Sequence, residues 1–432
     1  MGRGAESGGR DPAAPACAQG AGAIVLVLLA ASLGAEGGHA GAVRVSVGPP
    51  EVVMDYSRDS CAAAAGLDLP DVQARALANS QEGTLWLVSG NAPANYWMAG
   101  PGFDSLVRVC TPVLTSGDSP YPHTFDNQEW ITSVYRLGET VHALVHNEYH
   151  DPFAPACRPG VTDPSNPCWY NAITYAVSHD GGRSFTQQQA PGHVVAAAPW
   201  PWTTSGWPRG RPPGPYGYFS PSNIVRHRDG FYYALFFAIP DPANPARRGT
   251  CLMRTDDLAD PASWRAFDGT GFALTMRPPY APDGTPAPTG LEPCTFVSPG
   301  TIGDLHGSLT YNTYLEAYLL VGSGIVSTGG APVCGTFFSL SDDLLHWSAP
   351  QLLLPGKLPY PPCTTDGDPA GSLIYPSIID HAASPPNYET SGRTPHLYIV
   401  RWNQGLDRDL LRLPVTFERL GAPPRRKVPR AN

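Results

Sequence analysis

The chain has 432 residues, enough for a large core, and its 10% aromatic and 15% charged residues are typical of a packed protein. A formal net charge of −9 offers no basic face to a polyanion, so nucleic-acid binding is not expected. The 46 glycines and 49 prolines separate short apolar runs, which favours a turn-rich all-β fold. Sustained helical periodicity is missing beyond the N-terminal segment, which gives little support to a helical bundle or a βαβ fold.

Residues 1–40 have the pattern of a secretory signal peptide. Arginines precede an apolar run at residues 23–31, which is too short to span a bilayer comfortably, and small residues follow it. We expect cleavage near Ala40, a secreted extracellular protein and no membrane association afterwards. An uncleaved anchor is the alternative, because Glu6 and Asp11 dilute the positive charge.

The cysteines indicate disulfide bonds. Of the nine, Cys17 would leave with the signal, and an even number of eight remains, which predicts four disulfides in a secreted chain. Only Cys157 and Cys168 are close enough in sequence to be paired locally. The spacing is not that of a zinc site. No cofactor is expected, and no motif indicates structural calcium.

Short alternating runs recur along residues 67–413 and predict one domain, an all-β, five-bladed β-propeller, with six blades as the alternative. Five units are expected to begin at residues 67, 127, 218, 307 and 373. In four of them the expected second strand covers residues 84–89, 229–237, 316–321 and 396–402. Within a lead-in at residues 41–66, residues 43–47 alternate like a strand that pairs with a late blade. The basic tail, residues 414–432, is expected to be disordered.

A closing turn of the second unit, at residues 178–185, resembles the Asp-box hairpin of sialidases and other propellers. In such a turn Asp180 accepts backbone N–H bonds, a glycine adopts positive φ and Phe185 packs between sheets. Looser versions, with an Asp-Leu and a following Trp, occupy residues 255–264 and 341–347. All three turns are expected to be structural.

Propeller geometry predicts where chemistry lies, because residues before each first strand and after each second strand meet at one mouth. Candidate catalytic residues on this rule are Asp71, Glu129, Glu148 and His150. Candidate substrate-binding residues are Arg75, His146, Ser222, Asn223, His306, Arg401 and Trp402.

A pair of carboxylates at the mouth would suit glycoside hydrolysis, in which one group protonates the leaving oxygen and the other is base or nucleophile. Asp71 is the candidate base or nucleophile, with Arg75 one β-period away to keep it charged. The acid is Glu129, whose pKa the neighbouring Trp130 would raise, or Glu148, or the imidazole of His150. The sequence does not choose among them.

The Pro-Ser-Ile-like openings of the units and the Asp-Leu-x-x-Trp turns resemble the five-bladed arabinofuranosidase, xylosidase and fructosidase clan over residues 67–413. The resemblance implies a propeller with an aspartate in each of the first two blades and a glutamate in the third. Asp71 matches the first position, and Glu129 is a substitute at the second. Ser222 and Asn223 stand where the third-blade glutamate would be.

The predicted function is therefore that of a secreted, glycoside hydrolase-like propeller, expected to be a monomer, that takes an oligosaccharide or polysaccharide. A non-catalytic carbohydrate- or protein-binding propeller is the second reading, favoured by the missing third-blade carboxylate. Two further alternatives are a sialidase, with Arg75 and Arg401 as carboxylate ligands, and a polysaccharide lyase that uses His150 with Tyr149.

Overall fold

The computed structural model describes residues 43–61, 68–79, 82–154, 157, 168–203, 214–287, 290, 292–327, 330–364 and 367–420. The chain divides into two compact units, Met1–Glu36 and Gly37–Asn432, and all described residues belong to the second. The predicted signal at residues 1–40 and the tail from residue 421 lie outside the described residues. Within the described ranges, no helix is long and apolar enough to cross a membrane.

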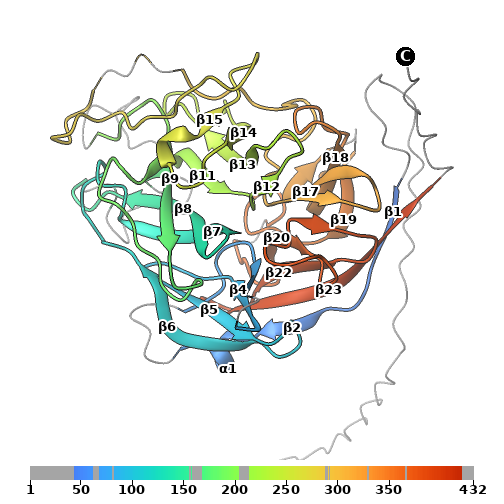
Figure 1. Cartoon of the computed structure of the whole chain (residues 1–432). Coiled ribbons are helices and arrows are strands. Elements are labelled where there is room, and N and C mark those ends of the chain that lie inside the picture. Colours follow the sequence, from blue (N-terminus) through green and yellow to red (C-terminus); the bar gives the residue numbers. More distant parts are fainter. Residues whose placement is uncertain are drawn as a thin grey trace, which may run out of the picture. The chain divides into compact units, whose positions relative to one another are not determined.

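The described part of the chain is almost entirely β, as predicted, with a one-turn helix α1 (Tyr56–Asp59) and a 3-10 helix η3 (Pro261–Ser263). Its strands follow one another in five mainly antiparallel groups (Figure 1). The first group is β3 (Arg75–Asn79), β4 (Thr84–Val88), β5 (Ala94–Gly100) and β6 (Val107–Thr115). The second is β7 (Gln128–Leu137), β8 (Thr140–His150), β9 (Trp169–Ser178) and β10 (Val194–Ala197).

The third group is β11 (Tyr216–Pro221), β12 (Val225–Arg226), β13 (Tyr232–Ile239), β14 (Gly249–Thr255) and β15 (Arg265–Ala266). It joins the second group in a nine-stranded sheet, because β11 pairs in parallel with β9. The fourth is β16 (Ser308–Asn312), β17 (Ala317–Val326), β18 (Val333–Ser341) and β19 (Gln351–Pro355), with β21 (Thr390–Ser391) parallel to β16. The fifth is β20 (Leu373–Ile379), β22 (His396–Trp402), β23 (Arg408–Arg419), β1 (Val43–Val47) and β2 (Glu51–Met54).

The all-β fold is confirmed, and β20 and β22 have the predicted bounds. The described strands pair into four sheets, of five, nine, five and four strands, so the count of five blades stays a prediction. The first unit differs, because its strand begins at Arg75 and not at residue 67. Pro70 has no N–H for a ladder, and Asp68 instead accepts a hydrogen bond from the Cys61 N–H. The predicted early strand is confirmed, since β1 pairs antiparallel with β23. That sheet therefore includes part of the predicted lead-in and of the predicted tail.

First strands of successive groups lie against one another. β3 contacts β7, β7 contacts β11, β12 contacts β16, β16 contacts β20 and β20 contacts β3. The apolar faces between groups carry the core; β13, for example, is buried at every position. Neighbouring groups of strands cover both faces of a sheet. Polar side chains on the first and second strands therefore lie either between two sheets or at the ends of the strands.

The turn at residues 178–185 has the expected bonding. Asp180 accepts hydrogen bonds from the N–H groups of Arg183 and Ser184, and Gly181 has φ +78°. Phe185 packs against Trp97 of the first group, with ring centroids 5.4 Å apart. The turn thus fixes the second group against the first, which is a structural role.

All eight cysteines in the described residues are paired, as Cys61–Cys110, Cys157–Cys168, Cys251–Cys294 and Cys334–Cys363. The predicted Cys157–Cys168 bridge is confirmed and spans 11 positions between β8 and β9. Replacing both of its cysteines by serine should lower the free energy of unfolding by about 3 kcal/mol, because a loop of this size regains its closure entropy when unfolded. Urea unfolding of C157S/C168S and wild type would measure the difference; identical midpoints would contradict it.

Candidate functional site

Strand register divides the polar side chains of the second group between two faces. His146, Glu148 and His150 alternate along β8 and therefore share one face. Glu148 lies opposite Asn171 of β9, so that side chain joins the same face. Glu129 of β7 lies opposite Asn147 and belongs to the other face.

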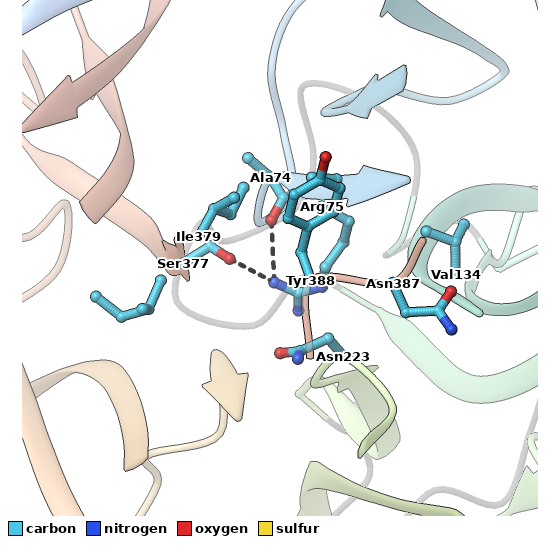
Figure 2. A pocket seen from close by; sticks show the side chains of 10 residues that line it. Ala74, Arg75, Val134, Asn223, Ser377, Ile379, Asn387 and Tyr388 are labelled. Atoms are coloured by element: carbon cyan, nitrogen blue, oxygen red, sulfur yellow. Dashed lines mark hydrogen bonds between the residues drawn. The ribbon is translucent and has the colours of Figure 1, made fainter. Parts of the chain in front are cut away.

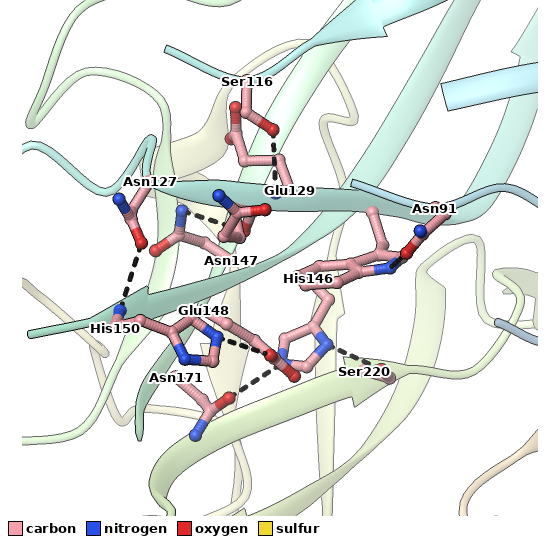
Figure 3. Close-up of polar contacts among 12 residues, drawn as sticks. Asn91, Ser116, Asn127, Glu129, His146, Asn147, Glu148, His150, Asn171 and Ser220 are labelled. Atoms are coloured by element: carbon pink, nitrogen blue, oxygen red, sulfur yellow. Dashed lines mark hydrogen bonds and ion pairs between the residues drawn. The ribbon is translucent and has the colours of Figure 1, made fainter. Parts of the chain in front are cut away.

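The shared face carries a cluster that we call the Glu148 cluster: His146, Glu148, His150, Asn171 and Ser220 (Figure 3). His150 Nε2 lies 3.1 Å from Glu148 Oε2, and His146 Nε2 lies 3.8 Å from Glu148 Oε1. The imidazole of His146 is held at both nitrogens, by Asn171 Oδ1 at 3.0 Å and by the Ser220 hydroxyl at 3.0 Å. Two sequence-predicted residues, Glu148 and His150, thus meet directly.

Burial and charge set the protonation of this cluster. Burial raises the pKa of Glu148, but the hydrogen bond from His150, together with smaller electrostatic contributions of the two neighbouring imidazoles, outweighs it, so the pKa lies below its ordinary value. Burial lowers the pKa of His146. At neutral pH the cluster therefore contains an ionised carboxylate beside a neutral, buried His146. The His150 side chain is 41% exposed and can meet a ligand.

Aromatic rings border the cluster. Trp169 meets His150 edge to face, with centroids 5.2 Å apart, and Trp130 lies 5.8 Å from His146. His306, predicted at the mouth, stacks on Phe237 at 5.5 Å, and its lowered pKa is due first to burial, with a smaller contribution from His146. Side chains from the second, third and fourth groups thus converge here.

Glu129 does not belong to this cluster, and the expectation that it lines the mouth beside Glu148 is wrong. Its side chain is fully buried and accepts hydrogen bonds at Oε1 from Gln187 at 2.8 Å and Thr174 at 3.3 Å. Burial, aided by the charge of Asp126, raises the pKa of Glu129 to about 7. The rise is due to enclosure between sheets, not to Trp130, which projects from the opposite face of β7.

Glu129 should make stability depend on pH. A carboxyl with a folded-state pKa near 7 and a reference value of 4.5 contributes stability below about pH 4.5, and this contribution is lost as pH rises through 7. The loss is on the order of 3 kcal/mol. Glu129→Gln keeps the Oε1 acceptor without the charge, so its stability should fall much less between pH 5 and pH 8 in urea titrations.

A matched control for that titration is Glu316→Gln, because Glu316 is an exposed carboxylate in the turn before β17. This variant should keep the pH dependence of the wild type. Equal pH dependence in Glu129→Gln and wild type would show that Glu129 is not the titrating group.

Asp71 pairs with a different arginine from the one expected. The prediction that Arg75 keeps Asp71 charged is wrong, since Asp71 forms its ion pair with Arg408, at the start of β23. The Arg408 guanidinium also lies 4.1 Å above the Trp402 ring. Asp71 is partly exposed, with 19% of its side chain accessible.

Arg75 is buried between the first strands. Its guanidinium donates to the carbonyl oxygens of Thr132 and Gly307, at 2.9 and 2.8 Å, and to the Ser377 hydroxyl at 2.9 Å. Burial lowers the pKa of Arg75 to about 9, which leaves it charged at neutral pH. These bonds tie together β3, β7, β20 and the segment before β16, so Arg75 is a structural residue and not an exposed substrate ligand.

Arg75 also lines a small pocket at this centre, together with Asn223, Ser377 and seven other residues (Figure 2). No carboxylate is among its lining residues. Asn223 donates to the Leu309 carbonyl and accepts from the Leu309 N–H, which joins the third and fourth groups. Ser222 is fully buried and accepts from the Leu235 N–H. The predicted ligand roles of Ser222 and Asn223 are replaced by these backbone bonds.

Two predicted binding residues, Arg401 and Trp402, have their contacts outside the Glu148 cluster. Arg401 Nη2 lies 2.6 Å from Asp409 Oδ2, and its side chain is 40% exposed. Trp402 lies beneath Arg408. The predicted mouth residues thus fall into the Glu148 cluster, an Asp71 cluster of Asp71, Arg408 and Trp402, and the central Arg75.

Sequence reasoning missed Asn171 and Arg408. Both stand near the start of a third strand, β9 and β23, whereas the mouth rule considered first and second strands only. The start of a third strand lies beside the end of the second, as the pairing of Trp402 with Arg408 shows. Extending the rule by one strand would have found both residues.

No metal centre is formed by the described residues, where no group of three or more His, Cys, Asp or Glu side chains is arranged to hold an ion.

No protein-family model matches the chain, and no curated protein matches it. Among solved structures, the alpha-L-arabinanase of Cellvibrio cellulosa complexed with arabinohexaose is 11% identical, with a TM-score of 0.42, covering 79% of this chain and 91% of its own. The alpha-L-arabinofuranosidase of Lactobacillus brevis is 10% identical (TM-score 0.44; 80% and 92% covered). The GH93 alpha-L-arabinofuranosidase of Fusarium graminearum with arabinobiose is 11% identical (TM-score 0.42; 86% and 98%). These glycosidases are of the kind that the sequence resembles, but likeness at this level assigns no activity.

Proposed function

We propose that the chain is a secreted, glycan-active five-bladed propeller of the glycoside hydrolase type. Support for the propeller comes from the five groups of strands, whose first strands contact one another in the order β3, β7, β11–β12, β16, β20 and β3 again. Arg75 bonds to four of these five groups, its own included, at the point where they meet. The four disulfides fit an oxidising, extracellular setting.

One observation carries the proposed activity: the ionised Glu148 is hydrogen-bonded to a partly exposed His150 at the end of β8. The carboxylate lies within hydrogen-bond distance of His150 Nε2 and can orient this imidazole for proton transfer to a ligand. His150 is then the group that protonates the leaving glycosidic oxygen, and Glu148 holds its charge and orientation. Trp169, beside His150, offers an apolar face to a sugar ring.

Asp71 is the proposed second carboxylate, the base or nucleophile of the pair. It is partly exposed, and Arg408 gives it a fixed cationic partner. In glycosidases the two reacting groups are about 5 to 10 Å apart, and that separation selects retention or inversion. Trapping a substrate between Asp71 and His150 is the direct test of this assignment.

A non-catalytic glycan-binding protein is the second candidate function, and a specific observation favours it. The Asp71 carboxylate is engaged by Arg408, and Glu129 is buried on the other face of β7, so neither is a free partner for Glu148. A mouth of this kind could bind a glycan and leave its bonds intact.

The sialidase and lyase alternatives lose support. A sialidase would need Arg75 at a substrate carboxylate, but that guanidinium is occupied by backbone carbonyls. A lyase would need the Tyr149 hydroxyl, yet Tyr149 is only 1% exposed and donates to the Pro120 carbonyl.

The proposed function is tested by screening the secreted, oxidised protein against nitrophenyl glycosides and, in parallel, against a glycan array. Hydrolysis that requires His150 would support the enzyme. Glycan binding without turnover would support the second candidate, and neither binding nor turnover on any glycan would overturn both.

A further inference from the structure

We propose that Ser220 is an activated nucleophile, with His146 as its general base, and that the Glu148 cluster supports ester hydrolysis as well as glycan chemistry. The inference comes from the hydrogen bonds that fix the protons on His146, which the glycoside proposal does not use. Three side chains from three strands, β11, β8 and β9, meet there in the order Ser220, His146 and Asn171 (Figure 3).

The orientation of Asn171 decides where the proton of His146 lies. Asn171 Nδ2 donates to the carbonyl oxygen of Tyr216 at 2.9 Å, so its Oδ1 is the atom that faces His146 Nε2. An amide oxygen only accepts hydrogen bonds, and His146 Nε2 must therefore carry the hydrogen. In the neutral imidazole the lone pair is then on Nδ1.

That lone pair faces Ser220. With Nδ1 unprotonated, the 3.0 Å contact requires the Ser220 hydroxyl to donate its proton to His146. A hydroxyl that donates to a basic imidazole, which is oriented in turn by a third group, is the arrangement that activates serine for nucleophilic attack. Glu148 Oε1, 3.8 Å from His146 Nε2, supplies negative charge that would stabilise the imidazolium formed when the proton moves.

The substrate class that fits is a carboxylic ester with a small acyl group. Ser220 is partly exposed, and the rings of Trp130 and Phe219 lie 5.8 and 6.0 Å from the His146 ring, so the base has apolar neighbours. A short acyl chain would pack there, while the alcohol portion extends toward His150.

The reaction balances with these groups and water alone. Ser220 Oγ bonds to the ester carbonyl carbon as its proton passes to His146 Nδ1. The bond between that carbon and the alcohol oxygen then breaks, and His146 returns the proton to the leaving oxygen. Water next gives a proton to His146 and attacks the acyl-serine, which releases the carboxylic acid and restores the Ser220 hydroxyl. Asn171 is a positioning residue throughout.

The experiment is labelling of the intact, oxidised protein with a fluorophosphonate probe, followed by peptide mass spectrometry. Ser298 is the matched control, since it is also partly exposed but donates its hydroxyl to the Leu345 carbonyl oxygen instead of an imidazole nitrogen. We expect Ser220 to react at least about 100-fold faster than Ser298, the contribution of a positioned general base. Equal labelling of the two serines would overturn the inference.

Two variants keep the result interpretable. Ser220→Ala should abolish the labelling, and Ser220→Cys, with a thiol in the same place, should react with iodoacetamide faster than Ser298→Cys. Because burial lowers the pKa of His146, the labelling rate should stay flat as the pH falls from 8 through the ordinary range of an imidazole, and should fall only at more acidic pH, where His146 is protonated. A rate that shows no such fall, or a cysteine at residue 220 no faster than one at residue 298, would count against a base at His146. The readout is independent of glycoside turnover, so failure here leaves the test of His150 unaffected.

Discussion

Replacing Glu148 by glutamine is expected to lower kcat/KM for any accepted glycoside by about 10²- to 10⁴-fold, the usual contribution of a positioned proton donor or acceptor. Glutamine keeps the size of the side chain but removes the charge that holds His150 at 3.1 Å. His150→Asn should cost a similar factor, because it removes the proton donor itself. The double variant should be little worse than either single one, since the two residues act as a unit.

The measurement is initial rates over a range of substrate concentrations. KM should change little in both variants, because the lost interaction forms in the transition state. Glu316→Gln, an exposed carboxylate far along the chain in the fourth group, should keep full activity. Full activity in both Glu148→Gln and His150→Asn would show that the Glu148–His150 pair is not the reactive group. The Asp71 cluster would then be the next candidate.

Replacing Arg75 by methionine should lower the free energy of unfolding by about 4 kcal/mol, since hydrogen bonds from a charged donor contribute about 1.5 to 3 kcal/mol each and burial of the charge offsets part of this. Methionine fills much of the same volume. It leaves the carbonyl oxygens of Thr132 and Gly307 without the partners they have now. Four groups of strands lose their common contact in one substitution.

Chemical denaturation monitored by tryptophan fluorescence would measure this loss, and the near-ultraviolet spectrum would show whether packing loosens first. Arg44→Met is the matched control, because Arg44 is half-exposed on β1 and meets Glu418 at 3.6 Å. An exposed pair of this kind contributes about 0 to 1 kcal/mol. If Arg75→Met and Arg44→Met unfold at the same denaturant concentration, the central guanidinium does not hold the sheets together.

The strands could be predicted from sequence because each depends on local alternation. Residues 373–379 and 396–402 alternate or run apolar between turn residues, and they became β20 and β22. His146, Glu148 and His150 share a face for the same reason, since alternate positions of one strand project to one side. The shared face of these three residues could therefore be predicted from one short stretch of sequence.

The remaining site depended on register and on distant pairing. Whether Glu129 and Glu148 share a face is decided by how β7 aligns with β8, and a slip of one residue would reverse the answer. Asp71 and Arg408 are 337 positions apart, and nothing near either residue indicates the other. Arg75 was assigned to Asp71 by proximity in sequence, whereas the carbonyls that it binds belong to other sheets.

The pairing of β1 with β23 has a consequence for how the chain folds. Val43 lies opposite Arg419, so the outer strand of the last sheet must wait until nearly all of the chain has been synthesised. Each of the four disulfides, by contrast, closes a segment of 49 positions or fewer and can form as its own group emerges. None of these four joins β1 to β23. The pairing of β1 with β23 is therefore held by hydrogen bonds and packing, and separating these two strands would leave the four disulfides intact.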